Sequence, residues 1–209
     1  MKQTARRFSR RALLASVFIG APGFLIGCER PAAERRFRGT DLSLVHYGRG
    51  FSLPDFDGKL RTPADFRGKV IMLYFGFTQC PDACPTALGR AKVIGELLGE
   101  NAKRWQLIFI SLDPERDSAE MLREYMAAFD PHFLALRPPS LEEVNKVAAE
   151  FKIFYRKVPT GGSYTLDHST QSYLLDPSGK LRVMLDYQLS PEDCVHDILT
   201  LQREQPLAT

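Results

Sequence analysis

The sequence predicts an α/β fold in which a central mixed β-sheet is flanked by helices. An unbroken apolar run at residues 70–77 is typical of a strand buried on both faces. Apolar strand patterns and amphipathic helix patterns then alternate along the chain. Near the C-terminal end, strand patterns at residues 171–175 and 181–185 are separated by Asp176-Pro177-Ser178-Gly179, a turn sequence that predicts a closing hairpin.

The first half of the domain is predicted to form a strand–helix–strand unit. A short strand and a turn near residues 51–58 open it. The central strand leads into an amphipathic helix that starts at Pro85 and ends near Gly99, and residues 106–111 predict a second buried strand. The apolar stripe of the helix consists of Leu88, Ala91, Ile94 and Leu98.

Capping residues mark the three later helices. Asp117, Ser140 and Ser190 are each predicted to cap one of them. A short strand is expected at residues 133–136, and residues 152–167 are expected to form a hairpin-like or irregular excursion because they are rich in glycine and contain a proline. The expected apolar face of the helix after Asp117 consists of Met121, Leu122, Tyr125, Ala128 and Phe129.

Residues 1–27 are predicted to be an export signal. Arginines precede an apolar stretch at residues 12–26 that is shorter than the ~20 residues of a membrane-spanning helix. Residues 9–14, SRRALL, resemble a twin-arginine motif, although a double arginine is also common in ordinary signals. Residues 25–28, LIGC, resemble a bacterial lipobox, so Cys28 is the expected lipidation site.

The predicted domain boundaries follow from this signal. Residues 28–45 lack apolar periodicity and are expected to be a lipid-anchored tether, and residues 46–205 are expected to form the folded domain. The protein is therefore expected on the periplasmic side of a membrane as a lipoprotein. Five of the 28 basic residues and none of the 25 acidic residues lie in residues 1–27, so the remainder has a net charge of −2. This charge gives no support to nucleic-acid binding.

Cys80 and Cys84 lie where the central strand passes into its helix. The N-terminal turn of a helix has free N–H groups and the positive end of the dipole, which favour thiolates. If the helix starts early, the two cysteines are i, i+4 neighbours that can form a disulfide or bind one soft metal ion. The alternative is a buried, inert pair, which the flanking Pro81 and Pro85 disfavour.

Three segments resemble a known family. Residues 75–85, FGFTQCPDACP, are similar to the signature of the Sco/SenC proteins, the copper chaperones of cytochrome c oxidase assembly. Residues 111–117 resemble the family's second motif, and residues 167–169 with 173–179 resemble its third. The resemblance implies a thioredoxin-like fold, which also fits a cysteine-bearing turn between the first core strand and its helix. It implies that copper is bound by Cys80, Cys84 and His168.

The implied ligand set suits copper in either oxidation state, because thiolates favour Cu(I) and imidazole favours Cu(II). Zinc accepts the same donors, usually with a fourth ligand, so the choice of copper depends on the resemblance. His168 has the alternative of an ordinary hydrogen-bonded loop residue. Three carboxylates are candidates to tune the site without binding metal: Asp82, Asp113 and Asp117. The alternative is a turn or cap role for Asp113 and Asp117, and an exposed partner contact or a turn role for Asp82.

The other histidines and one more cysteine are left outside the site. His46, His132 and His196 belong to no motif and are expected at the surface. Cys194 shares an apolar stripe with neighbours on the last helix, so a buried structural thiol is expected.

Two functional classes compete. The first is a metallochaperone, not an enzyme, that passes copper to the dinuclear CuA centre of cytochrome c oxidase subunit II. It would need a copper donor protein and a thiol reductant, because an exported cysteine pair tends to oxidise. The second is an extracytoplasmic thiol–disulfide oxidoreductase with a redox-active Cys80–Cys84 disulfide, disfavoured by three intervening residues where two are usual. A thiol peroxidase is a third, weaker alternative.

Overall fold

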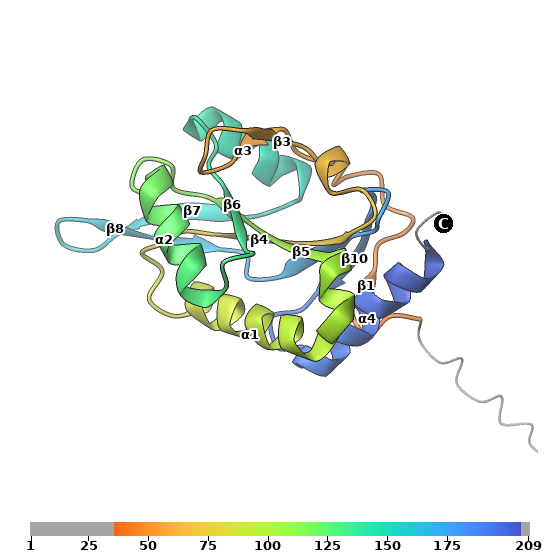
Figure 1. Ribbon diagram of the computed structural model, residues 1–209. Coiled ribbons are helices and arrows are strands. Elements are labelled where there is room, and N and C mark those ends of the chain that lie inside the picture. The colour runs from red at the N-terminus through yellow and green to blue at the C-terminus, as the bar shows by residue number, and fades with distance from the viewer. Residues whose placement is uncertain (1–35, 206–209) are drawn as a thin grey trace, which may run out of the picture. The chain divides into compact units, whose positions relative to one another are not determined.

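A six-stranded mixed β-sheet forms the centre of the computed structural model, which describes residues 36–205 (Figure 1). The strand order is β1-β10-β9-β4-β5-β6. β4, β5 and β6 run parallel, whereas β9 is antiparallel to β4 and β10 is antiparallel to both β9 and β1. The bounds are β1 Thr40–Asp41, β4 Val70–Gly76, β5 Trp105–Ser111, β6 Leu134–Leu136, β9 Ser172–Leu175 and β10 Leu181–Leu185.

Helices cover both faces of this sheet (Figure 1). α1 packs against α4 on one face, and α3 lies on the other. In the part of the chain described, the helices are α1 Ala83–Leu98, α2 Ala119–Phe129, α3 Leu141–Glu150 and α4 Pro191–Glu204, with 3-10 turns η1 Pro63–Phe66 and η2 Gly99–Arg104. The predicted class, a mixed sheet flanked by helices, is confirmed. Between residues 36 and 205, every helix is too short or too polar to cross a membrane.

Two small antiparallel sheets lie outside the central one. β2 (Leu53–Pro54) pairs with β3 (Leu60–Arg61) at the start of the domain, where a strand and a turn were expected. β7 (Tyr155–Pro159) pairs with β8 (Tyr164–His168) in a hairpin that projects from the domain at the left of Figure 1. The expected excursion after α3 is therefore a regular hairpin.

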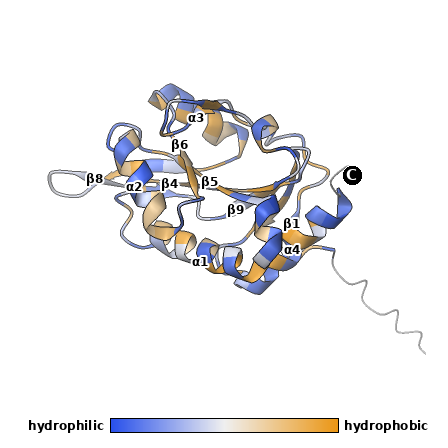
Figure 2. Ribbon diagram, viewed as in Figure 1, coloured by the Kyte–Doolittle hydropathy of each residue, from blue (hydrophilic) through white to orange (hydrophobic). Residues whose placement is uncertain are grey.

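The core follows from the apolar strands. All seven residues of β4 are buried, because this strand lies between two others and has helices over both faces. Figure 2 shows the hydrophobic residues gathered along the central strands and on the inward sides of the helices. The stripe predicted for α1 is buried as expected, and Cys84 and Ala87 extend it toward the N-terminal end of the helix.

Two of the three predicted caps are confirmed. The hydroxyls of Ser140 and Ser190 accept backbone N–H groups in the first turns of α3 and α4. The prediction for Asp117 was wrong, because Ser118 caps α2 and Asp117 is turned inward with no exposed surface. The predicted apolar face of α2 is confirmed in part, because Leu122 is buried and Tyr125 and Phe129 pack partly buried against the core. Met121 and Ala128 are exposed instead, and the buried Met126 was not predicted.

The folded domain begins earlier than the predicted boundary at residue 46. β1 pairs with β10 at the edge of the central sheet, and Phe37 is 3% exposed. The buried carboxylate of Asp197 in α4 accepts the backbone N–H groups of Arg38 and Gly39. Residues 36–45 are therefore part of the domain and not of a tether. A strand of two residues is too short to produce a periodic pattern.

The predicted export signal, the lipobox and the lipidation site Cys28 lie outside the residues that the structure describes.

Candidate metal centre

Cys80 and Cys84 lie in and after the turn that connects β4 to α1. The helix begins at Ala83, two residues before the predicted start, so Cys84 is in its first turn. Pro85 is tolerated there because a first-turn N–H has no partner inside the helix. The backbone N–H of Cys84 donates to the Cys80 sulfur at 3.4 Å. Both are free thiols, with Cys80 partly exposed and Cys84 fully buried.

The two thiols are electrostatically unequal. A hydrogen bond from the Cys84 thiol lowers the pKa of Cys80 to about 3, with further lowering by backbone N–H groups of the helix start. Burial opposes this shift but does not cancel it. The pKa of Cys84 is raised, first by its role as donor to Cys80 and then by burial. The structure therefore favours a thiolate at Cys80 and a protonated thiol at Cys84.

Gly76 and Tyr74, both on β4, form the pocket for the Cys84 sulfur. A Cβ atom on Gly76 would lie 2.6 Å from the sulfur and 2.9 Å from the ring of Phe109, so only glycine leaves room. The Tyr74 hydroxyl lies 3.9 Å from the same sulfur and donates to it. Neither residue was predicted to belong to the site, although a glycine inside a strand of bulky residues signals a close approach.

Replacing Gly76 with alanine is expected to displace Cys84. The added methyl group overlaps the sulfur and a ring that cannot turn away, so the thermal midpoint should fall by several degrees, consistent with an overpacking cost of about 1–3 kcal/mol. Circular dichroism melts would measure it. The same change at Gly89, where a Cβ atom meets nothing within 4 Å, is the control. Equal melting of both variants would contradict the role of Gly76.

His168 is the last residue of β8 and not a loop residue. Its Nε2 atom lies 3.7 Å from the Cys84 sulfur. Its Nδ1 atom lies 2.7 Å from the carbonyl oxygen of Ser169, an acceptor that requires the proton on Nδ1. Nε2 then presents its lone pair toward the sulfurs. The rings of Tyr74 and Phe77 meet the imidazole edge to face and fix its plane.

The three predicted ligands therefore converge. The sulfurs of Cys80 and Cys84 and one ring nitrogen of His168 all lie within 4.8 Å of one another. Two sulfurs and one imidazole form a donor set that suits a soft or borderline metal ion such as copper. The immediate surroundings also fit, because Ser169 orients the imidazole as carbonyl groups orient histidine ligands in metal sites.

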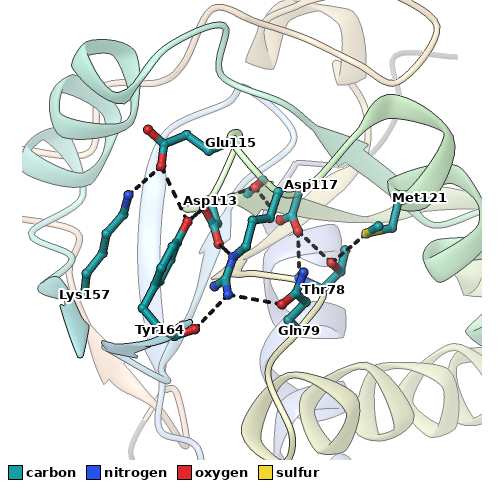
Figure 3. Close-up of polar contacts among 10 residues, drawn as sticks. Thr78, Gln79, Asp113, Glu115, Asp117, Met121, Lys157 and Tyr164 are labelled. Carbon is teal, nitrogen blue, oxygen red and sulfur yellow. Dashed lines mark hydrogen bonds and ion pairs between the residues drawn. The ribbon is translucent and has the colours of Figure 1, made fainter. Parts of the chain in front are cut away.

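The three candidate carboxylates are not part of this cluster. Asp117 accepts the backbone N–H and the hydroxyl of Thr78, as well as the Ser111 hydroxyl, and thus fixes the start of the cysteine turn (Figure 3). Burial raises the pKa of Asp117. Asp113 is 1% exposed and lies in a polar network next to the hairpin. Asp82 is exposed at the start of α1, where its side chain makes no capping hydrogen bond.

The remaining histidines and Cys194 lie outside the cluster, as expected. His46 and His132 are exposed, and His196 is partly exposed and hydrogen-bonded to Asp197. Cys194 is completely buried in α4, and burial raises its pKa to about 11. It is therefore a structural thiol.

The fold and the cysteine turn define a thioredoxin-like protein whose turn faces a histidine. The chain belongs to the SCO1/SenC family, whose model matches residues 40–203. It is 37% identical over 139 residues to a SCO2-like protein of Rickettsia prowazekii, covering 65% of this chain and 67% of that one. It is 35% identical over 179 residues to the mitochondrial SCO2 homologue of Bos taurus, covering 81% and 67%.

Solved structures of Sco proteins have the same fold as this chain. The copper-bound structure of Bradyrhizobium japonicum ScoI matches with a TM-score of 0.68 and 35% identity, over 77% of this chain and all of that one. The copper-bound structure of yeast Sco1 matches with a TM-score of 0.69 and 30% identity, over 78% and 92% of the two chains. The thioredoxin-like architecture predicted from the sequence is thus that of Sco proteins.

Proposed function

We propose that this protein is a copper metallochaperone that binds one copper ion through Cys80, Cys84 and His168. It would pass the ion by ligand exchange to the CuA centre of subunit II during cytochrome c oxidase assembly. A partly exposed Cys80 suits this transfer, because an incoming ligand can reach it from solvent. A copper donor protein and a thiol reductant are the further partners that this cycle needs.

The convergence of the three donors is the observation that supports the proposal. Cys84 and His168 are 84 positions apart, yet their sulfur and nitrogen atoms are 3.7 Å apart. The free nitrogen of His168 therefore lies close enough to both sulfurs for all three atoms to bind one ion. Copper-bound structures of relatives that share this fold agree with the choice of metal.

Replacing His168 with alanine tests the ligand set. Copper affinity, measured by competition with a chromophoric chelator, is expected to fall, most clearly for Cu(II), because an imidazole donor is lost. The control is His132→Ala, since His132 is exposed and outside the cluster. Disulfide exchange with a small-molecule disulfide should persist in both variants. An unchanged copper affinity would remove His168 from the proposed site.

A second candidate function is thiol–disulfide exchange outside the cytoplasm, including reduction of the CuA cysteines of the oxidase. The unequal thiol pair favours it, because a partly exposed thiolate with a pKa of about 3 lies next to a protonated thiol that could resolve a mixed disulfide. The two functions are compatible, since the pair must be reduced before it can bind metal. The His168→Ala variant separates them.

We also propose that the protein is anchored through Cys28 as a lipoprotein on the periplasmic side of a membrane. Replacing Cys28 with serine is expected to move the protein from the membrane pellet to the soluble fraction after cell lysis, because the acyl chains are lost. Immunoblotting of both fractions measures this. A variant that stays in the pellet would rule out the lipobox.

A further inference from the structure

The hairpin that carries His168 is not part of the central sheet, so other contacts must hold it over the cysteines. β7 and β8 form a two-stranded sheet of their own. Side chains alternate along a strand, so Tyr164, Leu166 and His168 share one face of β8. Leu166 is 5% exposed, which shows that this face lies against the domain. His168 is at one end of the face and Tyr164 is at the other.

Arg116, in the loop between β5 and α2, contacts both the hairpin and the cysteine turn. Its Nη1 donates to the carbonyl oxygen of Tyr164 at 2.7 Å and to Oε1 of Gln79 at 3.1 Å. Its guanidinium carbon lies 3.7 Å from the centroid of the Tyr164 ring and 5.8 Å from that of Phe77. Phe77 in turn contacts the imidazole of His168. One side chain thus joins the two segments that supply the candidate ligands.

The loop that contains Arg116 also contacts the hairpin through Asp113 and Glu115, which Figure 3 shows next to Tyr164 and Lys157. Nε of Arg116 donates to the buried carboxylate of Asp113, which also accepts the Tyr164 hydroxyl at 2.8 Å. Lys157 pairs with Glu115, and its Nζ lies 4.5 Å from the centroid of the Tyr164 ring. Two cations therefore contact one aromatic ring, an arrangement that stabilises its position. Asp113, Glu115 and Arg116 therefore all contact the part of the hairpin that is farther from His168.

We propose that Arg116 is a positioning residue that holds the β7–β8 hairpin so that His168 reaches the cysteine pair. This inference rests on the proposed function, in which His168 is a ligand. Arg116 acts through the hairpin and not as a ligand itself. Without the contact between Arg116 and Tyr164, the hairpin would pack less firmly against the domain, and the position of His168 at its end would be less well fixed. Metal affinity would suffer because an imidazole contributes only at coordination distance.

The main test is a double-mutant cycle in the full chain, purified in detergent. Arg116→Ala is expected to weaken Cu(II) binding by about 10-fold, the lower end of the range for residues that orient metal ligands. In the His168→Ala background the same change should have little further effect, because the residue through which Arg116 acts is absent. A structural role unrelated to His168 would give equal losses in both backgrounds.

Arg123 supplies a matched control. Like Arg116, it donates to a backbone carbonyl, here that of Phe56, and to a carboxylate, here that of Asp57. Its guanidinium carbon also lies over an aromatic ring, at 5.2 Å from the Phe56 centroid. It contacts neither the hairpin nor the cysteine turn through these groups. Arg123→Ala should leave copper affinity unchanged.

A measurement without metal completes the test. In the apo protein, NMR cross-peaks between the His168 ring and the Phe77 ring report their contact. These cross-peaks are expected to weaken in Arg116→Ala and to persist in Arg123→Ala. If Arg116→Ala does not fold, Arg116→Lys takes its place, since it keeps the charge but loses the planar fork that reaches several acceptors.

Other results would overturn the inference. If Arg116→Ala left both the copper affinity and the cross-peaks unchanged, the contacts of Arg116 would not be needed to position the hairpin. Full weakening in the His168→Ala background would show that Arg116 acts through the cysteine turn instead. If His168→Ala itself left copper binding unchanged, the proposed ligand set would fail, and the cross-peaks of the apo protein alone would decide the role of Arg116.

Discussion

Replacing both Cys80 and Cys84 with serine is expected to abolish stoichiometric copper binding. The two sulfurs supply both soft donors of the cluster, and one imidazole cannot retain Cu(I) without them. Serine hydroxyls are hard and stay protonated, so they do not replace thiolates. Copper content after gel filtration, measured by atomic absorption, should fall from one ion per chain to none.

Cys194 gives this experiment an internal control. It is a free cysteine like the other two, but it is buried in α4 and outside the cluster. Cys194→Ser should therefore keep one copper ion per chain, even if it lowers the thermal midpoint by burying a hydroxyl. Stoichiometric copper in the double cysteine variant would contradict the proposed site. Loss of copper in Cys194→Ser alone, with the fold intact, would contradict it as well.

The parts of the fold that could be predicted are those in which local pattern and tertiary environment agree. β4 is apolar throughout and is completely buried, and α1 has one continuous apolar stripe that faces the sheet. The hydroxyl caps of α3 and α4 follow from short-range hydrogen bonds that any helix start offers. Such features need only a few neighbouring residues, so the sequence displays them directly.

The parts that could not be predicted depend on distant partners. β1 has two residues and exists because β10 presents an edge to it. Asp117 looks like a cap in the sequence, but Thr78, from another segment, draws its carboxylate inward. In both cases, hydrogen bonds to a distant segment determine the structure of the residues concerned.

The candidate site shows the same division. The cysteine pair and its location at a helix start could be inferred from the residues around them. The approach of His168 to Cys84 could not be inferred in this way, because short-range sequence patterns do not show that two residues 84 positions apart lie together. Family resemblance supplied that part of the prediction. Gly76 and Arg116 were missed because their contacts, to a sulfur and to a hairpin, exist only in the folded chain.

Replacing Cys84 with alanine is expected to raise the pKa of Cys80 by several units. The hydrogen bond from the Cys84 thiol is the largest cause of the low value of about 3, and alanine removes it while the helix N–H groups remain. An ordinary thiol, with a pKa of about 8.5, is less than ~0.1% ionised at pH 5. The Cys80 thiolate fraction at pH 5 should therefore fall by at least about 10-fold.

The rate of alkylation by iodoacetamide between pH 3 and 9 measures this change, with the modified residue identified by mass spectrometry. In the otherwise unchanged chain, the rate at Cys80 should be nearly independent of pH above about 4, because the thiol is already ionised there. In Cys84→Ala the rate should rise with pH until it reaches the new pKa. The shape of the profile is the criterion, because a thiolate of low pKa is also a weaker nucleophile. Two profiles with the same midpoint would show that Cys84 does not stabilise the thiolate, and the unequal pair on which thiol exchange depends would lose its explanation.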